Sequence, residues 1–392
     1  MVAGCFIFDS LCSGKKNVLT TYEENMDLYN AVKPTNLPDH YRAWMELAND
    51  LPNLIESRKL RDLVHKMPVL STHLLNSPQE LRLAHLALGF ITMGYVWQEG
   101  QHAPAKILPR ALAVPYWVVS RRLGLPAVLT YADSVLSNWK LRDPSKNMDL
   151  VISLPGGGSC RGFFLVSLLV EMAASSGIKV GIVMHAVENK DPASVNRGLL
   201  DLTASLKKMK EIFKLMHRKK LTVCGLYYFR WRDNPMLPEG LVYEGVSNEP
   251  VLLSGGSAAQ STAIQCFDAL LGIQHDNESG AFLTRMRDYM PPAHRQLIET
   301  LSDCPSLRDF ILSCANPDLK QAFNDCVLAL EDLRTYHVSA VTKYIVVPAN
   351  RAQETGHSDR GAGDKLDATG TGGSSLLVFL KSVRDTTRKV LI

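Results

Sequence analysis

The amino-acid sequence predicts an all-α protein with two helical domains. Apolar residues recur at steps of three and four along most of the 392 residues, whereas strict apolar–polar alternation over strand length is scarce. The composition, 46% hydrophobic and 21% charged, is that of an ordinary globular protein. A run rich in Pro and Gly at 155–159 interrupts the helical pattern. We therefore expect an N-terminal extension at 1–17, a small helical domain at 18–154 and a large helical domain at 155–392.

Two helices are predicted early in the small domain. Their apolar residues recur at helical spacing, first Leu47, Leu51, Leu54 and Ile55 and then Leu81, Ala84, Leu88 and Ile91. Residues 36–38 supply a start for the first helix. Ser77 followed by Pro78, with Glu80 in the first turn, supplies the start of the second, because these residue types satisfy the free amides of a helix N-terminus.

Prolines interrupt the next part of the small domain. Pro115 and Pro126 fall within the stretch 109–126, and a proline inside a helix removes a hydrogen bond and clashes with the preceding turn. We therefore expect 109–126 to be a connector or a set of short turns.

The large domain is predicted to contain three strong helices and a mobile loop. The helices cover 162–174, 199–216 and 321–347, where apolar residues keep a helical period. Residues 348–375 are Gly-rich and polar and have no apolar period. This composition predicts a mobile loop, which would act as a lid if it lies near a pocket.

Charge and cysteine content exclude several classes of protein. The 43 Lys and Arg residues nearly balance the 39 Asp and Glu residues and are spread along the chain, so no nucleic-acid groove is indicated. The eight cysteines are irregularly spaced and form no CxxC pair, which favours reduced thiols. We find no targeting signal, and the apolar run at 162–169 is too short to cross a membrane. A cytoplasmic protein without a transmembrane helix is expected.

The glycine-rich run before the large domain is a weak candidate for a phosphate site. Gly156, Gly158 and Gly162 resemble a loosened dinucleotide fingerprint ahead of a helix, but the spacing is wrong and no alternation of strands and helices follows. A nicotinamide-dependent enzyme is therefore kept only as a contrasting hypothesis. Hydrolase chemistry has no support, because Arg161 stands where a GxSxG elbow needs glycine.

His337 is the strongest candidate for a metal-ligating residue. It belongs to a stripe at steps of three and four along the last long helix, formed by Phe323, Val327, Leu330, Arg334, His337, Val341 and Tyr344. An imidazole on this inward face needs partners for both ring nitrogens. A haem iron is one such partner, and a core histidine satisfied by other residues is the alternative.

Two tyrosines have flanking residues that a phosphotyrosine-binding SH2 domain could recognise. Tyr116 lies in VPYWVV and Tyr243 in LVYEGV, each with an apolar residue two positions before and three positions after the tyrosine. Such matches are common by chance. A packed or half-buried tyrosine is the alternative at both positions.

Several unusual strings, taken together, resemble the indoleamine 2,3-dioxygenases. They include YVWQEG at 95–100, YADSVLSNW at 131–139, RGFFLVSLLVE at 161–171, QCFDALLGIQ at 265–274, MRDYMPPAHR at 286–295 and LRTYHVSAVTKY at 333–344. The resemblance extends from about residue 18 to the end of the chain. YVWQEG and GGSAAQST resemble the second, weakly active vertebrate paralogue more than the first. An all-α protein of two domains with one haem b between them is what this resemblance implies.

The resemblance also implies roles for individual residues. His337 matches the proximal ligand of the haem iron, Asp268 matches the acidic residue that supports this ligand, and Arg334 could meet a haem propionate. A lid over the substrate is implied for Gly370–Ser374. The family pocket for the indole ring, made of apolar groups and small hydroxyls, is matched by Tyr131, Ser134, Val135, Phe163, Phe164, Ser167, Gly256, Ser257, Ala258 and Thr371.

The implied reaction is the addition of both atoms of O2 across the indole C2–C3 bond of L-tryptophan, which gives N-formylkynurenine. In the family this is the first step of the kynurenine pathway of tryptophan catabolism and part of immune regulation. Related indoleamines are further expected substrates.

One segment departs from the family pattern. Between His217 and Trp231 the chain is about five residues shorter than family members. Counted back from Trp231, Gly225 holds the position of the arginine that grips the substrate carboxylate, and Lys220 and Leu221 hold those of an aromatic pair. An arginine fork contributes about 2 kcal/mol or more to a desolvated carboxylate. The alternative function is therefore a haem-binding signalling scaffold with little or no activity, recruited through Tyr116 and Tyr243.

Overall fold

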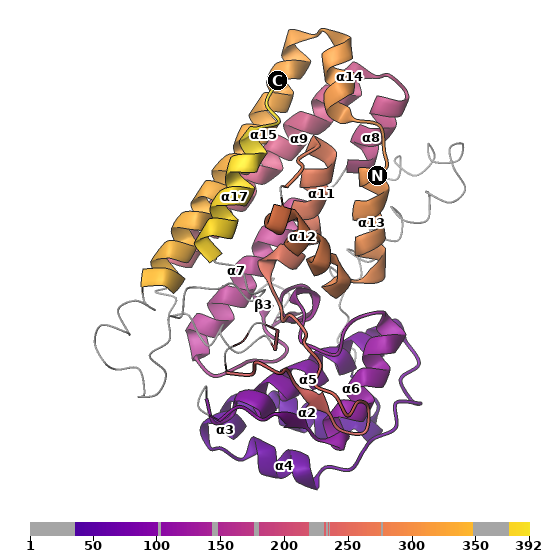
Figure 1. Cartoon of the computed structure of the whole chain (residues 1–392), viewed down its shortest axis with the longest axis vertical. Coiled ribbons are helices and arrows are strands. Elements are labelled where there is room, and N and C mark those ends of the chain that lie inside the picture. Colours follow the sequence, from indigo (N-terminus) through magenta and orange to yellow (C-terminus); the bar gives the residue numbers. More distant parts are fainter. Residues whose placement is uncertain are drawn as a thin grey trace.

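The structure, a computed structural model, describes residues 36–100, 103–142, 148–175, 180–218, 231–232, 234, 236–275, 277–347 and 376–392. These residues are mostly helical, which confirms the predicted all-α class. Within these ranges, strands form only two separate two-stranded pairs. Figure 1 shows the first helices of the chain gathered at one end of the molecule and the later helices at the other.

The elements of the first part of the chain are short helices around one long one. They are η1 (Asp39–Tyr41), α2 (Arg42–Asn49), α3 (Leu51–Glu56), α4 (Leu60–Lys66), α5 (Pro78–Trp97), β1 (Ile107–Leu108), α6 (Arg110–Leu123), the π-helix η2 (Ala132–Ser137), β2 (Lys140–Leu141) and β3 (Met148–Asp149).

The second part contains the longest helices. Its elements are α7 (Gly157–Ser175), α8 (Val180–Glu188), α9 (Pro192–Phe213), α10 (Leu215–Arg218), β4 (Val242–Tyr243), η4 (Ala258–Gln260), α11 (Thr262–Leu271), α12 (Asn277–Met286), η5 (Arg287–Tyr289), α13 (Pro292–Ser302), α14 (Leu307–Cys314), α15 (Pro317–Val341), the π-helix η6 (Thr342–Val346) and α17 (Leu376–Arg388).

Helix α5 forms the centre of the first apolar core. Its start follows the predicted chemistry: the Ser77 hydroxyl accepts a hydrogen bond from the Glu80 amide at 3.2 Å, and the Glu80 carboxylate accepts one from the Ser77 amide at 2.9 Å. This reciprocal pair satisfies two amides that the helix itself leaves free. From Ala84 onward every residue of α5 is buried.

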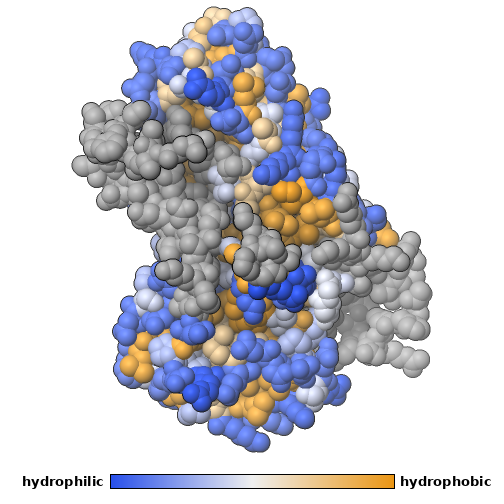
Figure 2. Space-filling view, turned by 180° about the vertical axis from the view of Figure 1, so that it is seen from behind, coloured by the Kyte–Doolittle hydropathy of each residue, from blue (hydrophilic) through white to orange (hydrophobic). Residues whose placement is uncertain are grey.

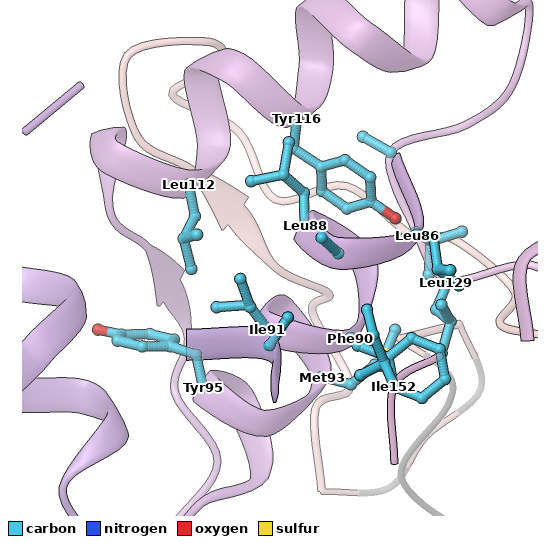
Figure 3. Close-up of a cluster of buried hydrophobic side chains, with 14 of the residues drawn as sticks. Leu86, Leu88, Phe90, Ile91, Met93, Tyr95, Leu112, Tyr116, Leu129 and Ile152 are labelled. Carbon is cyan, nitrogen blue, oxygen red and sulfur yellow. The ribbon is translucent and has the colours of Figure 1, made fainter. Parts of the chain in front are cut away.

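Residues 110–123 form helix α6, so the prediction of short turns at 109–126 was wrong. Pro115 lies inside this helix, and its missing amide is tolerated because the face that carries Leu112 and Tyr116 packs against α5. The two helices approach closely at Gly89, where a Cβ atom would lie 2.9 Å from the Tyr116 hydroxyl. Burial of this face outweighs the lost hydrogen bond. Figure 3 shows the Tyr116 ring pointing into this core.

Helices α7, α9 and α15 form the frame of the second core. Helix α9 packs along both α7 and α15, and α17 packs along α15 (Figure 1). The predicted inward stripe on the last long helix is confirmed, since Phe323, Val327 and Leu330 are fully buried. The predicted helix at 199–216 is divided between α9 and α10 at Lys214.

A segment that follows α10 in sequence returns to the first core. Trp231, Leu237 and Leu241 belong to the same buried cluster as α5 and α6. Strand β4 pairs in parallel with β1, with Val242 opposite Ile107. The first core therefore contains residues from both sides of the predicted domain boundary near 154, and that boundary stays a prediction.

Helix α7 is the only helix among the described residues that is long and apolar enough to cross a membrane. Half of that stretch is buried inside the protein, and it packs against η2 and α9. A core helix of a soluble protein passes the same test of length and composition, so this feature is weak evidence for a membrane span.

We expect Ser77→Ala to lower the free energy of unfolding by about 1 kcal/mol, because the first turn of α5 loses its N-cap. Urea unfolding followed by circular dichroism measures this change. Ser77→Asn, which keeps a capping oxygen, is the matched control and should lose much less. Equal stability of Ser77→Ala and the wild type would contradict the role of the capping box.

Candidate functional site

His337 lies near the end of α15, on the stripe that faces the interior. Its side chain is half-buried, and the Phe213 ring of α9 meets its imidazole edge-on, with ring centroids 5.6 Å apart. Burial, with a smaller effect of the nearby Arg334 charge, lowers the pKa of His337 to about 4. The imidazole is therefore neutral at neutral pH. Its ring nitrogens form no hydrogen bond with the residues that the structure describes.

A buried ion pair lies one turn before His337. The Arg334 guanidinium donates through Nη2 to both carboxylate oxygens of Asp268, at 2.8 and 2.7 Å, and Thr387 on α17 accepts from its Nη1. His275 Nε2 lies 2.8 Å from Asp268 Oδ2. Burial opposes ionisation of Asp268, but Arg334 and His275 lower the pKa of its carboxyl below the ordinary value. The pair joins α11, α15 and α17.

The structure gives Asp268 and Arg334 contacts with each other. The Asp268 oxygens meet Arg334 and His275, and no hydrogen bond joins them to the His337 imidazole among the described residues. The Arg334 guanidinium is buried against this carboxylate and contacts Thr387. The support of His337 by Asp268 and the contact of Arg334 with a haem propionate stay predictions.

The π-helix η2 carries two of the expected pocket residues, Ser134 and Val135, and a third, Tyr131, precedes it at the N-cap position. It is held by buried Asp133, whose Oδ2 accepts from the amide and the hydroxyl of Thr130, at 2.9 and 2.7 Å. The other oxygen of Asp133 lies 2.8 Å from Nδ1 of His85 on α5. This network fixes the segment that contains Ser134 and Val135, both of which are buried.

The loop before α11 approaches η2 at Gly256. A Cβ atom at this position would lie 3.3 Å from backbone atoms of Thr130 and Tyr131, which is tighter than ordinary van der Waals contact. Ser257 is half-buried and Ala258 is exposed. The structure thus places Gly256 close to the backbone of Thr130 and Tyr131.

Helix α7 carries the remaining described pocket residues. The Phe163 and Phe164 rings meet edge-on at 5.5 Å, and the Ser167 hydroxyl donates to the Phe163 carbonyl at 2.9 Å. The Ser134 hydroxyl likewise donates to the Thr130 carbonyl, at 3.0 Å. Each serine therefore donates its hydroxyl proton to a backbone carbonyl four residues earlier in the chain.

The residues around His337 and those on α7 are joined by a small apolar cluster. Val166 and Met216 are buried together, and Phe163 and Phe213 pack against them. Since Phe213 also contacts His337, the proximal candidate and the α7 wall share one apolar neighbourhood. Figure 2 shows hydrophobic surface near the middle of one face of the molecule.

Glu171 was not identified as a site residue from the sequence. Its carboxyl adds an acid to the expected pocket, which the family resemblance describes as made of apolar groups and small hydroxyls. Its buried carboxyl accepts hydrogen bonds from Tyr131 at 2.9 Å and from Ser261 at 2.6 Å. Burial raises the pKa of Glu171 against the opposing effect of these two bonds. The sequence held a signal, because Glu171 is the one charged residue between Gly162 and Ala174.

Other expected features lie outside the described residues or are not supported. Thr371, the loop at 348–375 and the shortened segment at 219–230 lie outside the described residues. The dinucleotide hypothesis fails, because the part of the chain that is described has no parallel sheet beyond the two-residue pair of β1 and β4. In the same part, no group of three His, Cys, Asp or Glu could hold a metal ion.

The two candidate phosphotyrosines are buried. Tyr116 and Tyr243 are both 0% exposed, and burial raises the pKa of each phenol. The Tyr243 hydroxyl accepts from Trp231 Nε1 and donates to the Ala127 carbonyl. As folded, neither hydroxyl is available to a kinase or an SH2 domain, so the structure does not support recruitment through these tyrosines.

Comparisons with known proteins identify the family of this chain. The family described as indoleamine 2,3-dioxygenase matches residues 28–390. Indoleamine 2,3-dioxygenase 1 of Rattus norvegicus is 46% identical over 98% of this chain and 98% of its own length. Indoleamine 2,3-dioxygenase 2 of Mus musculus is 47% identical over 91% and 90%, so overall identity does not separate the two paralogues. A myoglobin of Haliotis madaka is 39% identical over 95% of this chain and 98% of its own length. The chain belongs to the indoleamine 2,3-dioxygenase family.

Proposed function

We propose that this protein is a haem b dioxygenase that adds both atoms of O2 across the indole C2–C3 bond of L-tryptophan and forms N-formylkynurenine. The observation that carries the proposal is His337, a neutral, half-buried imidazole whose ring nitrogens bond to no described residue. An iron ligand requires this state, because the lone pair of a neutral ring nitrogen binds the metal. The apolar contact of the His337 imidazole with Phe213 fits the surroundings of a haem ligand.

The haem, when bound through His337, supplies the iron chemistry that activates O2. Arg334 and Asp268 hold α15, and Phe213 restricts the tilt of the imidazole through its edge-on contact. Groups that surround a metal-ligating histidine fix the orientation of its ring and tune how strongly it binds the metal.

The walls around Tyr131 and α7 would bind the indole and exclude water. Phe163, Phe164 and Val135 offer apolar surface to an aromatic ring, which is what an indole pocket needs. Ser134 and Ser167 donate to backbone carbonyls, so neither of these two hydroxyl protons is directed at the substrate.

A haem protein with little or no turnover is the second candidate. It is favoured by the shortened segment at 217–231, in which Gly225 stands at the position of the carboxylate-binding arginine. One relative is named myoglobin, so proteins of similar sequence carry names that refer to different activities. We also propose a cytoplasmic location, which the thiols of Cys266, Cys314 and Cys326, not bridged in the structure, support.

The two candidates differ in product formation. The purified holoprotein, supplied with L-tryptophan, O2 and a chemical reductant, is expected to form N-formylkynurenine, measured by absorbance and mass spectrometry. A protein that keeps a full complement of haem but forms no product under these conditions would overturn the dioxygenase proposal and favour the second candidate.

His337→Ala is expected to abolish stable haem binding, because the iron loses its proposed protein ligand. The absorption spectrum of the ferrous carbonyl form and the haem-to-protein ratio measure this loss. His185→Ala, which changes a half-buried histidine on α8, is the matched control and should keep its haem. An unchanged Soret band in His337→Ala would refute the assignment of the ligand.

Asp268→Asn should destabilise the fold by about 3 kcal/mol, because it leaves the Arg334 charge buried without its partner. The pKa of Asp268 lies below its ordinary value of 3.8. The ion pair therefore stabilises the wild type above about pH 4, and this contribution is lost as the pH falls through the lowered pKa. Thermal unfolding between pH 3 and 7 should show a steeper acid loss in the wild type than in Asp268→Asn. Parallel curves would contradict the role of the ion pair.

A further inference from the structure

Glu171 is a buried carboxyl for which the proposed reaction has no assigned use. It lies one turn beyond Ser167 on the same face of α7. Among the described residues, hydrogen bonds reach only Oε1, from the hydroxyls of Tyr131 and Ser261. Oε2 forms no hydrogen bond with a described residue.

The two hydroxyls belong to the other two walls of the proposed pocket. Tyr131 caps η2, which carries Ser134 and Val135. Ser261 caps α11 directly after the loop 256–258, and its hydroxyl also accepts a hydrogen bond from the amide of Ile264. One oxygen atom of α7 therefore ties together all three segments that carry the described pocket residues.

A second contact repeats this connection without α7. The Tyr131 amide donates to Oε1 of Gln260 at 2.9 Å, and Nε2 of Gln260 donates to the Gly255 carbonyl at 2.7 Å. Tyr131 is thus held to the 255–261 loop through its backbone and to Glu171 through its side chain. Of these two attachments, only the one through Glu171 fixes the position of the phenol ring.

The surroundings of Glu171 show that its charge is not used for an ion pair. Within the described ranges, no Lys or Arg lies within salt-bridge distance of its carboxyl. Burial raises the pKa of Glu171. A buried acid without a cation weakens the fold unless its oxygens receive hydrogen bonds. Glu171 therefore acts here as a hydrogen-bond acceptor.

We propose that Glu171 is a positioning residue for the reaction of L-tryptophan: it holds the Tyr131 ring and the Ser261 loop so that the three walls enclose the indole. This inference rests on the proposed function. It assigns Glu171 no proton transfer and no contact with the reacting atoms. The role requires an oxygen acceptor at this position and does not require a negative charge.

The test compares Glu171→Ala with Glu171→Gln in the holoprotein. Loss of hydrogen bonds to a charged or buried acceptor corresponds to about 10-fold to 100-fold in binding. Glu171→Ala should therefore raise KM for L-tryptophan, and Kd measured from the Soret shift on substrate addition, by at least about 10-fold. Glu171→Gln keeps an oxygen acceptor and should stay within about 3-fold of the wild type in both quantities. Glu188→Ala, an exposed glutamate at the end of α8, is the control.

A double-mutant cycle identifies the partner. Tyr131→Phe removes the hydroxyl and keeps the ring, so Glu171→Ala combined with Tyr131→Phe should be no worse than Glu171→Ala alone. Additive losses would overturn the role of this hydrogen bond. Thermal unfolding of the haem-free variants separates a loss of substrate positioning from a general loss of stability. Equal losses of stability in Glu171→Gln and Glu171→Ala would also overturn the proposal.

The outcomes distinguish this inference from the proposed function. A wild-type holoprotein that forms no N-formylkynurenine refutes the proposed function, whatever the variants do. A wild type that turns over L-tryptophan, together with a Glu171→Ala variant of unchanged KM and Kd, refutes only the positioning role.

Discussion

The buried ion pair between Arg334 and Asp268 is the interaction on which the site depends most. Two charges removed from water are tolerated only where geometry and further hydrogen bonds compensate for their lost hydration. Here one guanidinium nitrogen of Arg334 contacts both oxygens of Asp268, Thr387 accepts from the other terminal nitrogen, and His275 meets the carboxylate. Three elements distant in sequence, α11, α15 and α17, must therefore assemble together, and the orientation of His337 follows from that assembly.

The two buried carboxyls of the site are used in opposite ways. Asp268 is matched by a cation and stays ionised, so it acts as an electrostatic anchor. Glu171 has no cation beside it among the described residues and is held by two hydroxyls. The first fixes the helix that presents the candidate iron ligand, and the second ties together the walls proposed to hold the substrate. Both carboxyls therefore serve as structural supports that join helices to one another.

Local chemistry explains which features could be predicted from the sequence. The capping box at Ser77 and the inward stripe of α15 follow from contacts between residues three or four positions apart, and both appear in the structure. The proline rule failed at Pro115 because α6 is held by α5, and a local rule contains no information about that partner. Tyr116 and Tyr243 matched a short motif, but their burial depends on residues far away in the chain.

The sequence by itself determined the helical class, the family resemblance and the identity of His337 as the candidate ligand, because spacing and residue type carry this information. Only the tertiary structure decided that Asp268 meets Arg334 and not the imidazole, and that Glu171 joins Tyr131 to Ser261. Their partners lie between 40 and 90 positions away. Periodicity along a chain describes one face of one helix at a time, whereas a hydrogen bond between helices depends on how they are packed.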